Sequence, residues 1–395
     1  MRLALGLALL PGLGTGLLLV VVAGMHLPLA IAWPQLAQAH GQIQTLGFVL
    51  PFIVAVGLQL FPRFLGSPLT HAERGAWGCG ILALALTARL VGQPLAPSAA
   101  RVALLAAAVV GVPVGGLALG SALGLCVWSG LVLALGGEVV PVGLDEALIH
   151  LELAGFAVAL VFAVGSRVFG RFLLLQTRPA LEQRIPLLAW LWGAGLVVVV
   201  LGWLLDVQGS VWLRWLGSLI ELGVLVTWLW LVGLYDLPSR ESGTPYVTNP
   251  TRRWVRLAFA FALFSVSLNV GLFGREALLG VAPSITELSA ARHALGQGFL
   301  MPLVVTMAAR MLPFVSADAV KHRLRLEVIV DLLLAGALVR VAAEVTGGYS
   351  AETGPLVALG GTLSIVGFAL FAAGMWSSLG RLPRARAATA AASAE

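Results

Sequence analysis

Three histidines, His40, His150 and His293, stand near the start of three apolar segments that resemble one another. Each segment continues through a Gly-Phe pair into an apolar run: Gly47-Phe48, Gly155-Phe156 and Gly298-Phe299. His150 and His293 both lie five residues before that pair and seventeen before an arginine, and the matching position in the first segment is Gln42, two residues after His40. Neutral imidazole is a common ligand of iron and copper. The spacing predicts a threefold-repeated protein whose histidines bind a metal centre.

The composition indicates which class of protein must position these histidines. The 395 residues are 59% hydrophobic and 11% charged, with a mean hydropathy of +0.98, whereas soluble domains carry about 25% charged residues. We therefore expect an integral membrane protein with many spans. The net charge of +6 comes from basic residues in loops between apolar runs, which favours cytoplasmic loops over nucleic-acid binding. Cys79 and Cys126 lie in apolar segments, so we expect neither a disulfide nor a zinc site.

The apolar windows predict an all-α fold, because their lengths suit transmembrane helices rather than the short strands of a barrel. We expect about twelve spans, near 3–25, 41–62, 74–92, 99–116, 118–137, 147–168, 186–205, 211–233, 254–274, 288–312, 325–345 and 354–379. They divide into three pseudo-repeats of four helices, over residues 1–116, 117–236 and 254–380, with a cytoplasmic linker at 237–253 and a cytoplasmic tail at 381–395. An even number of spans makes the repeats parallel.

Charge asymmetry predicts the orientation, with both termini in the cytoplasm. The expected inner loops hold most of the arginines, and the expected outer loops hold acids: Glu138, Asp145, Glu146, Asp206, Glu276 and Glu287. His40, His150 and His293 then fall at the outer ends of helices 2, 6 and 10, at roughly one depth. Facing helices in a bundle can hold a haem between two axial side chains.

Two arginines depart from this pattern. Arg89 lies 47 residues after Gln42, and Arg340 lies 47 residues after His293, both near the outer ends of their helices. Because an arginine fork suits carboxylates, haem propionates are one expected partner, and snorkelling to lipid headgroups is the other. Glu221, Asn269, Glu327 and Asp331 also lie inside expected spans, where they form either helix–helix hydrogen bonds or a proton path.

At these same residues the chain resembles the NnrS family of bacterial membrane proteins. The stretch HALGQGFLMPLVVTMAAR, residues 293–310, is similar to that family's His-Ala-Leu segment; AHGQIQTLGF resembles its His-x-His-Glu helix, GSRVFGRF its Gly-Arg-Val segment, and LVRVAAE its Leu-Arg-Val element. The resemblance implies a bacterial inner-membrane protein that copes with nitric oxide and nitrosative stress and binds haem and copper. Gln42 and Ile43 replace the family's second histidine and its glutamate, which weakens the expectation of copper.

A more distant likeness is to haem-copper oxidase subunit I, which also has twelve helices in three arcs. It implies a low-spin haem held by His40 and His293, with His150 at the position of a copper ligand. Helix 7, at residues 186–205, contains no histidine, so we do not expect oxygen or nitric oxide reduction at a binuclear centre. We expect haem b between helices 2 and 10, held by His40 and His293 and anchored by Arg89 and Arg340, with His150 as a third ligand or a hydrogen-bond donor.

Two other functions remain open. The first is a proton-coupled transporter that uses Glu221, Glu327, Asp331 and the histidines. The second is a non-catalytic subunit of a respiratory membrane complex, in which the histidines are structural. The expected partners are the lipid bilayer, nitric oxide or quinol, and respiratory-complex subunits or a second copy of the chain. The sequence does not distinguish a catalytic, a sensory and an electron-transferring role.

Overall fold

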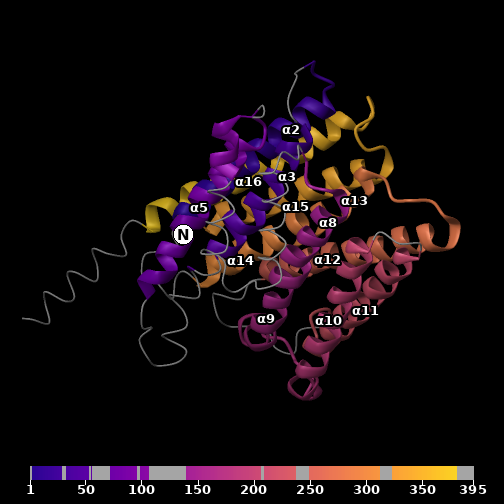
Figure 1. The fold of residues 1–395 in the computed structure, drawn as a ribbon. Coiled ribbons are helices and arrows are strands. Elements are labelled where there is room, and N and C mark those ends of the chain that lie inside the picture. Colours follow the sequence, from indigo (N-terminus) through magenta and orange to yellow (C-terminus); the bar gives the residue numbers. More distant parts are fainter. Residues whose placement is uncertain are drawn as a thin grey trace, which may run out of the picture.

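The structure is a computed structural model that describes residues 2–28, 33–52, 55, 72–95, 98–105, 139–205, 209–236, 249–311 and 323–379 (Figure 1). Over these residues the chain forms helices and no strand. The expected helical membrane class is confirmed, because six of the helices are long and apolar enough to cross a bilayer.

The helices follow the expected spans in chain order. The N-terminal part contains α1 (Arg2–Leu7), η1 (Ala8–Gly14), α2 (Thr15–Gly24), α3 (Trp33–Gln42), η2 (Ile43–Val49) and α5 (Ala72–Gly92). The middle part contains α8 (Val142–His150), η3 (Leu151–Val158), α9 (Ala159–Phe172), α10 (Ala180–Leu204) and α11 (Ser210–Val232). The last part contains α12 (Asn249–Leu279), α13 (Ile285–His293), η4 (Ala294–Leu300), α14 (Met301–Met311), α15 (Arg323–Thr346) and α16 (Gly354–Leu379).

Among the described residues, six spans meet the length and composition of a transmembrane helix: Arg2–Gly24, Val142–Gly170, Ala180–Leu204, Ser210–Val232, Pro250–Leu279 and Gly354–Trp376. They coincide with the expected spans 1, 6, 7, 8, 9 and 12. The third expected span contains a shorter apolar helix, Trp77–Gly92. Most of the expected pair at 99–137, the inner half of the second expected span, residues 237–248 of the expected linker and the tail lie outside the described residues. The remaining linker residues, 249–253, are instead the start of α12.

Two helical hairpins are held together by close backbone contact between glycines. In α10 and α11, a Cβ on Gly217 would lie 2.7 Å from the carbonyl oxygen of Gly195. In α15 and α16, a Cβ on Gly336 would lie 2.7 Å from the carbonyl oxygen of Gly360. Small residues at such crossings let membrane helices gain contact that the hydrophobic effect does not supply in lipid. The α10–α11 pair and the α15–α16 pair lie in different parts of the molecule (Figure 1).

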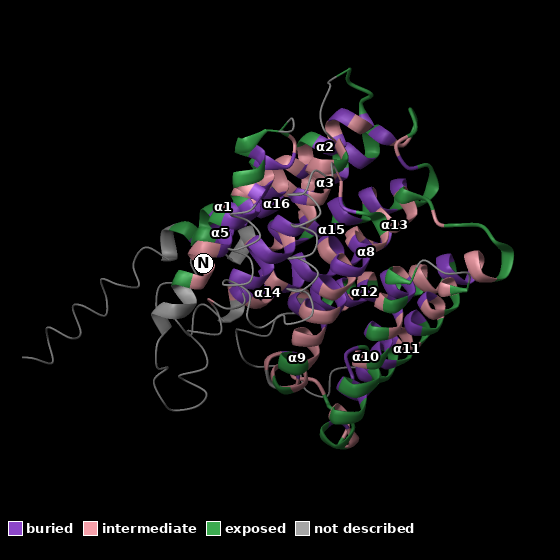
Figure 2. Ribbon diagram, in the orientation of Figure 1, coloured by how far each residue is buried: buried purple, intermediate pink, exposed green. Residues whose placement is uncertain are grey.

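The core is a run of aromatic rings across the middle of the bundle, where Figure 2 shows mostly buried residues. Phe162 stacks on Trp228 with ring centroids 4.8 Å apart, Trp228 meets Phe259 at 5.5 Å, and Phe259 meets Phe299 at 4.8 Å. Phe299 belongs to the third Gly-Phe pair, and Phe48 of the first pair packs edge-on against Phe368. The phenylalanines of the first and third pairs are therefore in the core, and Phe156 of the second is partly buried against it.

In the described part of the chain, four helical segments have π geometry, and three of them begin at matching sequence positions. The first residue of η2 follows Gln42, that of η3 follows His150, and that of η4 follows His293. These segments pack on one another, η2 against η3 and η3 against η4. A π segment holds an extra residue in the helix and is often found at functional sites. Each of these three π segments therefore begins directly after one of the matched positions, Gln42, His150 or His293.

Candidate functional site

His293 ends α13 and contacts a carboxylate on α15. Its Nδ1 lies 3.1 Å from Oε2 of Glu344, whose side chain is completely buried. The other carboxylate oxygen accepts hydrogen bonds from Nε of Arg340, at 3.1 Å, and from the hydroxyl of Ser289, at 3.2 Å. A buried charge is tolerated when it is paired and fully hydrogen-bonded. Three donors satisfy this one.

The bond between His293 and Glu344 fixes the tautomer of the imidazole. An ionised carboxylate only accepts hydrogen bonds, so the proton of a neutral ring must be on Nδ1. The lone pair is then on Nε2, for which no hydrogen bond is described. A metal-binding histidine is characteristically held in this way, with one nitrogen donating to a carboxylate or carbonyl and the other free to ligate.

His40, on α3, is also anchored through Nδ1, in this case by a backbone carbonyl of η1. Its Nδ1 lies 2.8 Å from the carbonyl oxygen of Gly12, which belongs to η1. A carbonyl oxygen can only accept, so Nδ1 again carries the proton and Nε2 the lone pair. The ring approaches closely because its neighbour on α2 is Gly16, where a Cβ would lie 3.0 Å from both ring nitrogens. Gly16 therefore leaves the space that the His40 ring fills.

Arg340 connects the surroundings of the two histidines. It is 7% exposed, and its positive charge acts on the His40 ring. Gly361 of α16 lies under the guanidinium, with the position of a Cβ 3.9 Å from Nη1 and 3.1 Å from a methyl group of Val20 on α2. Arg340 thus lies beside the Glu344 carboxylate that His293 contacts, and near α2, the helix against which the His40 ring packs.

Arg89 occupies a matching arrangement in the first part of the chain. Its Nε donates to Oε1 of Gln93 at 3.1 Å, four residues later, as Arg340 donates to Glu344. It also donates to the side-chain oxygen of Gln42, the residue at the position of His293. Gln93 in turn donates to Gln38. The two arginines predicted from their spacing therefore have equivalent neighbours, which are amides around Arg89 and a carboxylate beside Arg340.

His150 is bonded differently from the other two histidines. Its Nε2 lies 2.8 Å from Oε1 of Glu221 on α11, whose side chain is 1% exposed. The proton of a neutral ring is then on Nε2, and the lone pair is on Nδ1. His150 lines a cavity of about 40 Å³ together with Asn269 and Arg292, which is room for water but not for a haem.

The structure therefore links His293 to Arg340 through Glu344, places the His40 ring against the first helix, and gives Arg89 and His150 their own partners. In the described part of the chain, no group of three or more His, Cys, Asp or Glu side chains is close enough to hold a metal ion. Glu221 forms the interhelical hydrogen bond that was one of the two roles expected for it. Asp331, at the expected inner side, bonds to the arginine Arg253 at 3.1 Å and to the indole of Trp254 at 2.9 Å.

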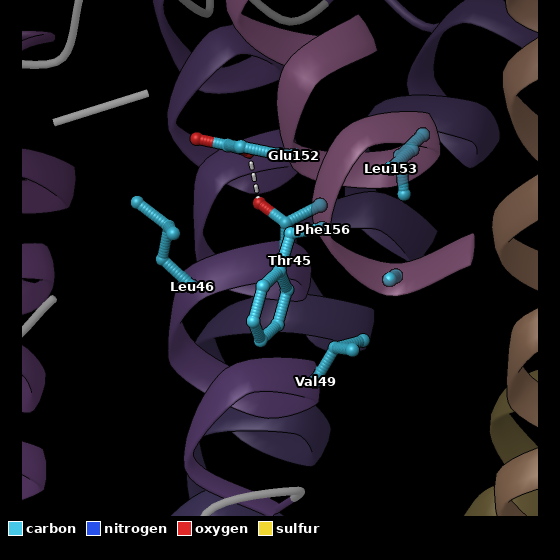
Figure 3. A pocket seen from close by; sticks show the side chains of 7 residues that line it. Thr45, Leu46, Val49, Glu152, Leu153 and Phe156 are labelled. Atoms are coloured by element: carbon cyan, nitrogen blue, oxygen red, sulfur yellow. Dashed lines mark hydrogen bonds between the residues drawn. The ribbon is translucent and has the colours of Figure 1, made fainter. Parts of the chain in front are cut away.

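Sequence reasoning did not identify two carboxylates of this region. The signal for Glu344 was its position four residues after Arg340, which puts both on one face of a helix. The second carboxylate, Glu152 on η3, is 2% exposed and accepts a hydrogen bond from Thr45 on η2. Figure 3 shows this bond above a small apolar hollow lined by Leu46, Val49 and Phe156. Glu152 is two residues after His150, and that proximity was its signal.

The described residues form a helical bundle of the membrane class in which two partly buried histidines, His40 and His293, are each anchored through Nδ1. Comparison with protein-family models and with curated proteins gives no match to this chain.

Proposed function

We propose that this protein binds haem b between helices 2 and 10, that is, between α3–η2 and α13–η4–α14, with His40 and His293 as the axial ligands. The observation that carries the proposal is the shared tautomer of the two rings. Both donate from Nδ1 to a fixed acceptor, the carbonyl of Gly12 or the carboxylate of Glu344, and both keep the Nε2 lone pair. Such a donor set suits a b-type haem, which has no covalent link to the protein.

The other residues of the region fit an amphipathic cofactor. Arg340 uses Nε for Glu344 and also forms a hydrogen bond with the Tyr349 side chain, and we propose its guanidinium as the anchor of a propionate, which arginine binds well. Arg89 is the second proposed anchor, at the matching position of the first repeat. The three π segments after Gln42, His150 and His293 support the threefold repeat, because each copy departs from α geometry at the same register.

Haem held by two histidines would supply a one-electron redox centre, and a diatomic gas would bind it only by displacing one of the two. The chain's own residues would orient the two imidazoles, exclude water with the aromatic core, and neutralise the propionates. Together with the resemblance to the NnrS family, this supports haem-based redox chemistry or nitric oxide handling in the bacterial cytoplasmic membrane. His150 would act near the site through Glu221 rather than as a third haem ligand, because its Nε2 is engaged.

The test is the absorption spectrum of the protein purified from haem-replete cells. We expect a Soret band in the wild type, its loss in His40→Ala and in His293→Ala, and its retention in His26→Ala. His26 is a suitable control because it is exposed and follows the first helix. Addition of nitric oxide to the reduced protein should shift the band. A folded wild-type protein with no Soret band would refute the proposal.

A second function, proton-coupled transport, is favoured by one observation. The pair formed by His150 and Glu221 is buried in the bundle, beside a cavity large enough for water. A transporter of this kind would take up protons into liposomes without bound haem, and Glu221→Gln would abolish the uptake. Uptake that is the same in Glu221→Gln and the wild type would exclude this role for the pair.

A further inference from the structure

The carboxylate of Glu344 is completely buried and hydrogen-bonded through both oxygens. Oε2 accepts a hydrogen bond from the His293 imidazole, and Oε1 accepts hydrogen bonds from Arg340 and Ser289. The donors on Oε1 hold the carboxylate in place, so that Oε2 is fixed relative to the ring. Nδ1 of His293 contacts both this oxygen and the Ser289 hydroxyl, each at 3.1 Å, so both partners restrict the orientation of the ring.

The two proposed ligands consequently differ in electron-donating strength. The acceptor of His40 is a neutral backbone carbonyl, whereas that of His293 is a charged carboxylate. A hydrogen bond to a carboxylate draws the Nδ1 proton away from the ring and makes Nε2 a stronger donor to a metal. A stronger donor stabilises ferric iron relative to ferrous iron and so lowers the reduction potential.

The chain contains an internal comparison that links this carboxylate to the histidine. Position by position, Ser289, His293, Arg340 and Glu344 correspond to Gln38, Gln42, Arg89 and Gln93. The arginine and its hydrogen bond to the residue four positions later are the same in both sets. Where the histidine is replaced by glutamine, the glutamate is also replaced by glutamine. In the two matched sets, a carboxylate accompanies the histidine and an amide accompanies the glutamine.

We infer that Glu344 is the positioning residue of the proposed haem site: it holds the Nε2 atom of His293 toward the iron and lowers the reduction potential of the bound haem. This inference rests on the proposed function. Arg340 acts on the same carboxylate, so its role is to hold Glu344 as well as to bind a propionate.

The experiment compares haem affinity and midpoint potential in Glu344→Gln and the wild type. Loss of a hydrogen-bond partner behind a metal ligand typically lowers affinity by about 10- to 100-fold. We expect a loss in that range and a more positive potential. A tenfold change in the relative stability of the two oxidation states corresponds to about 59 mV for one electron.

Two further variants separate positioning from other causes. Glu276→Gln removes a carboxylate that pairs with Arg214 at 3.0 Å and touches none of the three histidines, so it should leave both quantities unchanged. The double variant Glu344→Gln/Arg340→Gln keeps the net charge and leaves no unpaired guanidinium, so it tests a folded protein even where Glu344→Gln is unstable. We expect it to keep the more positive potential.

The outcomes are distinct. A wild type that binds no haem refutes the proposed function and this inference with it. A haem-loaded wild type whose affinity and potential are unchanged in Glu344→Gln leaves the proposed function intact and refutes the positioning role. A double variant that returns to the wild-type potential assigns the effect to net charge and also refutes it.

Discussion

Replacement of Gly16 by alanine tests the position of the His40 ring directly. The new Cβ would lie 3.0 Å from both ring nitrogens and still closer to Cε1, well inside the normal contact distance of about 3.5–4.0 Å. The neighbours of the Cβ are ring atoms of a side chain that is itself anchored to Gly12 of the same helix. The ring can move away only by breaking that hydrogen bond.

The magnitude follows from two costs. Overpacking of a tight interior typically costs about 1–3 kcal/mol, and the lost hydrogen bond contributes about 0.5–1.5 kcal/mol. We therefore expect Gly16→Ala to destabilise the protein by about 2–4 kcal/mol relative to a matched glycine replacement. Gly14→Ala is that match, because it lies two residues away in the same helix and its Cβ would make an ordinary contact at 3.4 Å. The gain in helix propensity cancels between the two variants.

The assay is thermal unfolding of both variants in detergent, together with haem content. Gly16→Ala should unfold at a lower temperature than Gly14→Ala and should bind less haem, because the His40 ring is displaced. Equal unfolding temperatures and equal haem content in the two variants would show that the ring does not lie against Gly16. That result would also contradict the hydrogen bond from Nδ1 of His40 to Gly12, and with it the assigned tautomer.

Two other predictions concern stability. Hydrogen bonds from Arg275 lower the pKa of Glu287, at the start of α13, from 4.5 to about 2. Because the pKa of Glu287 is lower in the folded protein, its stabilisation is complete above pH 4.5 and is lost as the pH falls toward 2. The unfolding temperature of Glu287→Gln should therefore depend less on pH over that range than that of the wild type. An unchanged pH dependence would contradict this prediction. Gly336→Ala would bring a Cβ within 2.7 Å of the carbonyl oxygen of Gly360 and should destabilise the protein by about 1–3 kcal/mol. Gly271→Ala, whose Cβ would meet open space, should not destabilise it. Equal melting curves for the two variants would contradict the close packing of α15 on α16.

Much of the helical layout could be predicted because membrane spans are encoded in composition. The windows at 3–25, 186–205 and 354–379 agree with the helices within a few residues, since a long apolar run must satisfy its backbone internally in lipid. The π segments could not be predicted in this way. An α and a π turn bury the same apolar residues, and the choice between them depends on packing of η2, η3 and η4 against one another.

The candidate site was predictable in its residue types and less so in its pairings. Equal spacing singled out His150 and His293 alike, but a linear pattern does not tell which ring nitrogen will face a carboxylate. That depends on residues far along the chain, Glu221 for His150 and Glu344 for His293. The helical repeat could have linked Arg340 to Glu344, four residues apart, whereas the contact of His40 with Gly12 and Gly16 required the packing of two helices.

The π segments have a mechanical consequence for the histidines that precede them. One residue corresponds to a rotation of roughly 100° about the axis of an α-helix. If η4 relaxed to α geometry, absorbing its extra residue, α13 would turn by about that angle relative to α14, and His293 would swing away from Glu344. The direction of each imidazole is thus controlled by the winding of the seven or eight residues behind it, and a conformational signal could enter the site through the pitch of a helix.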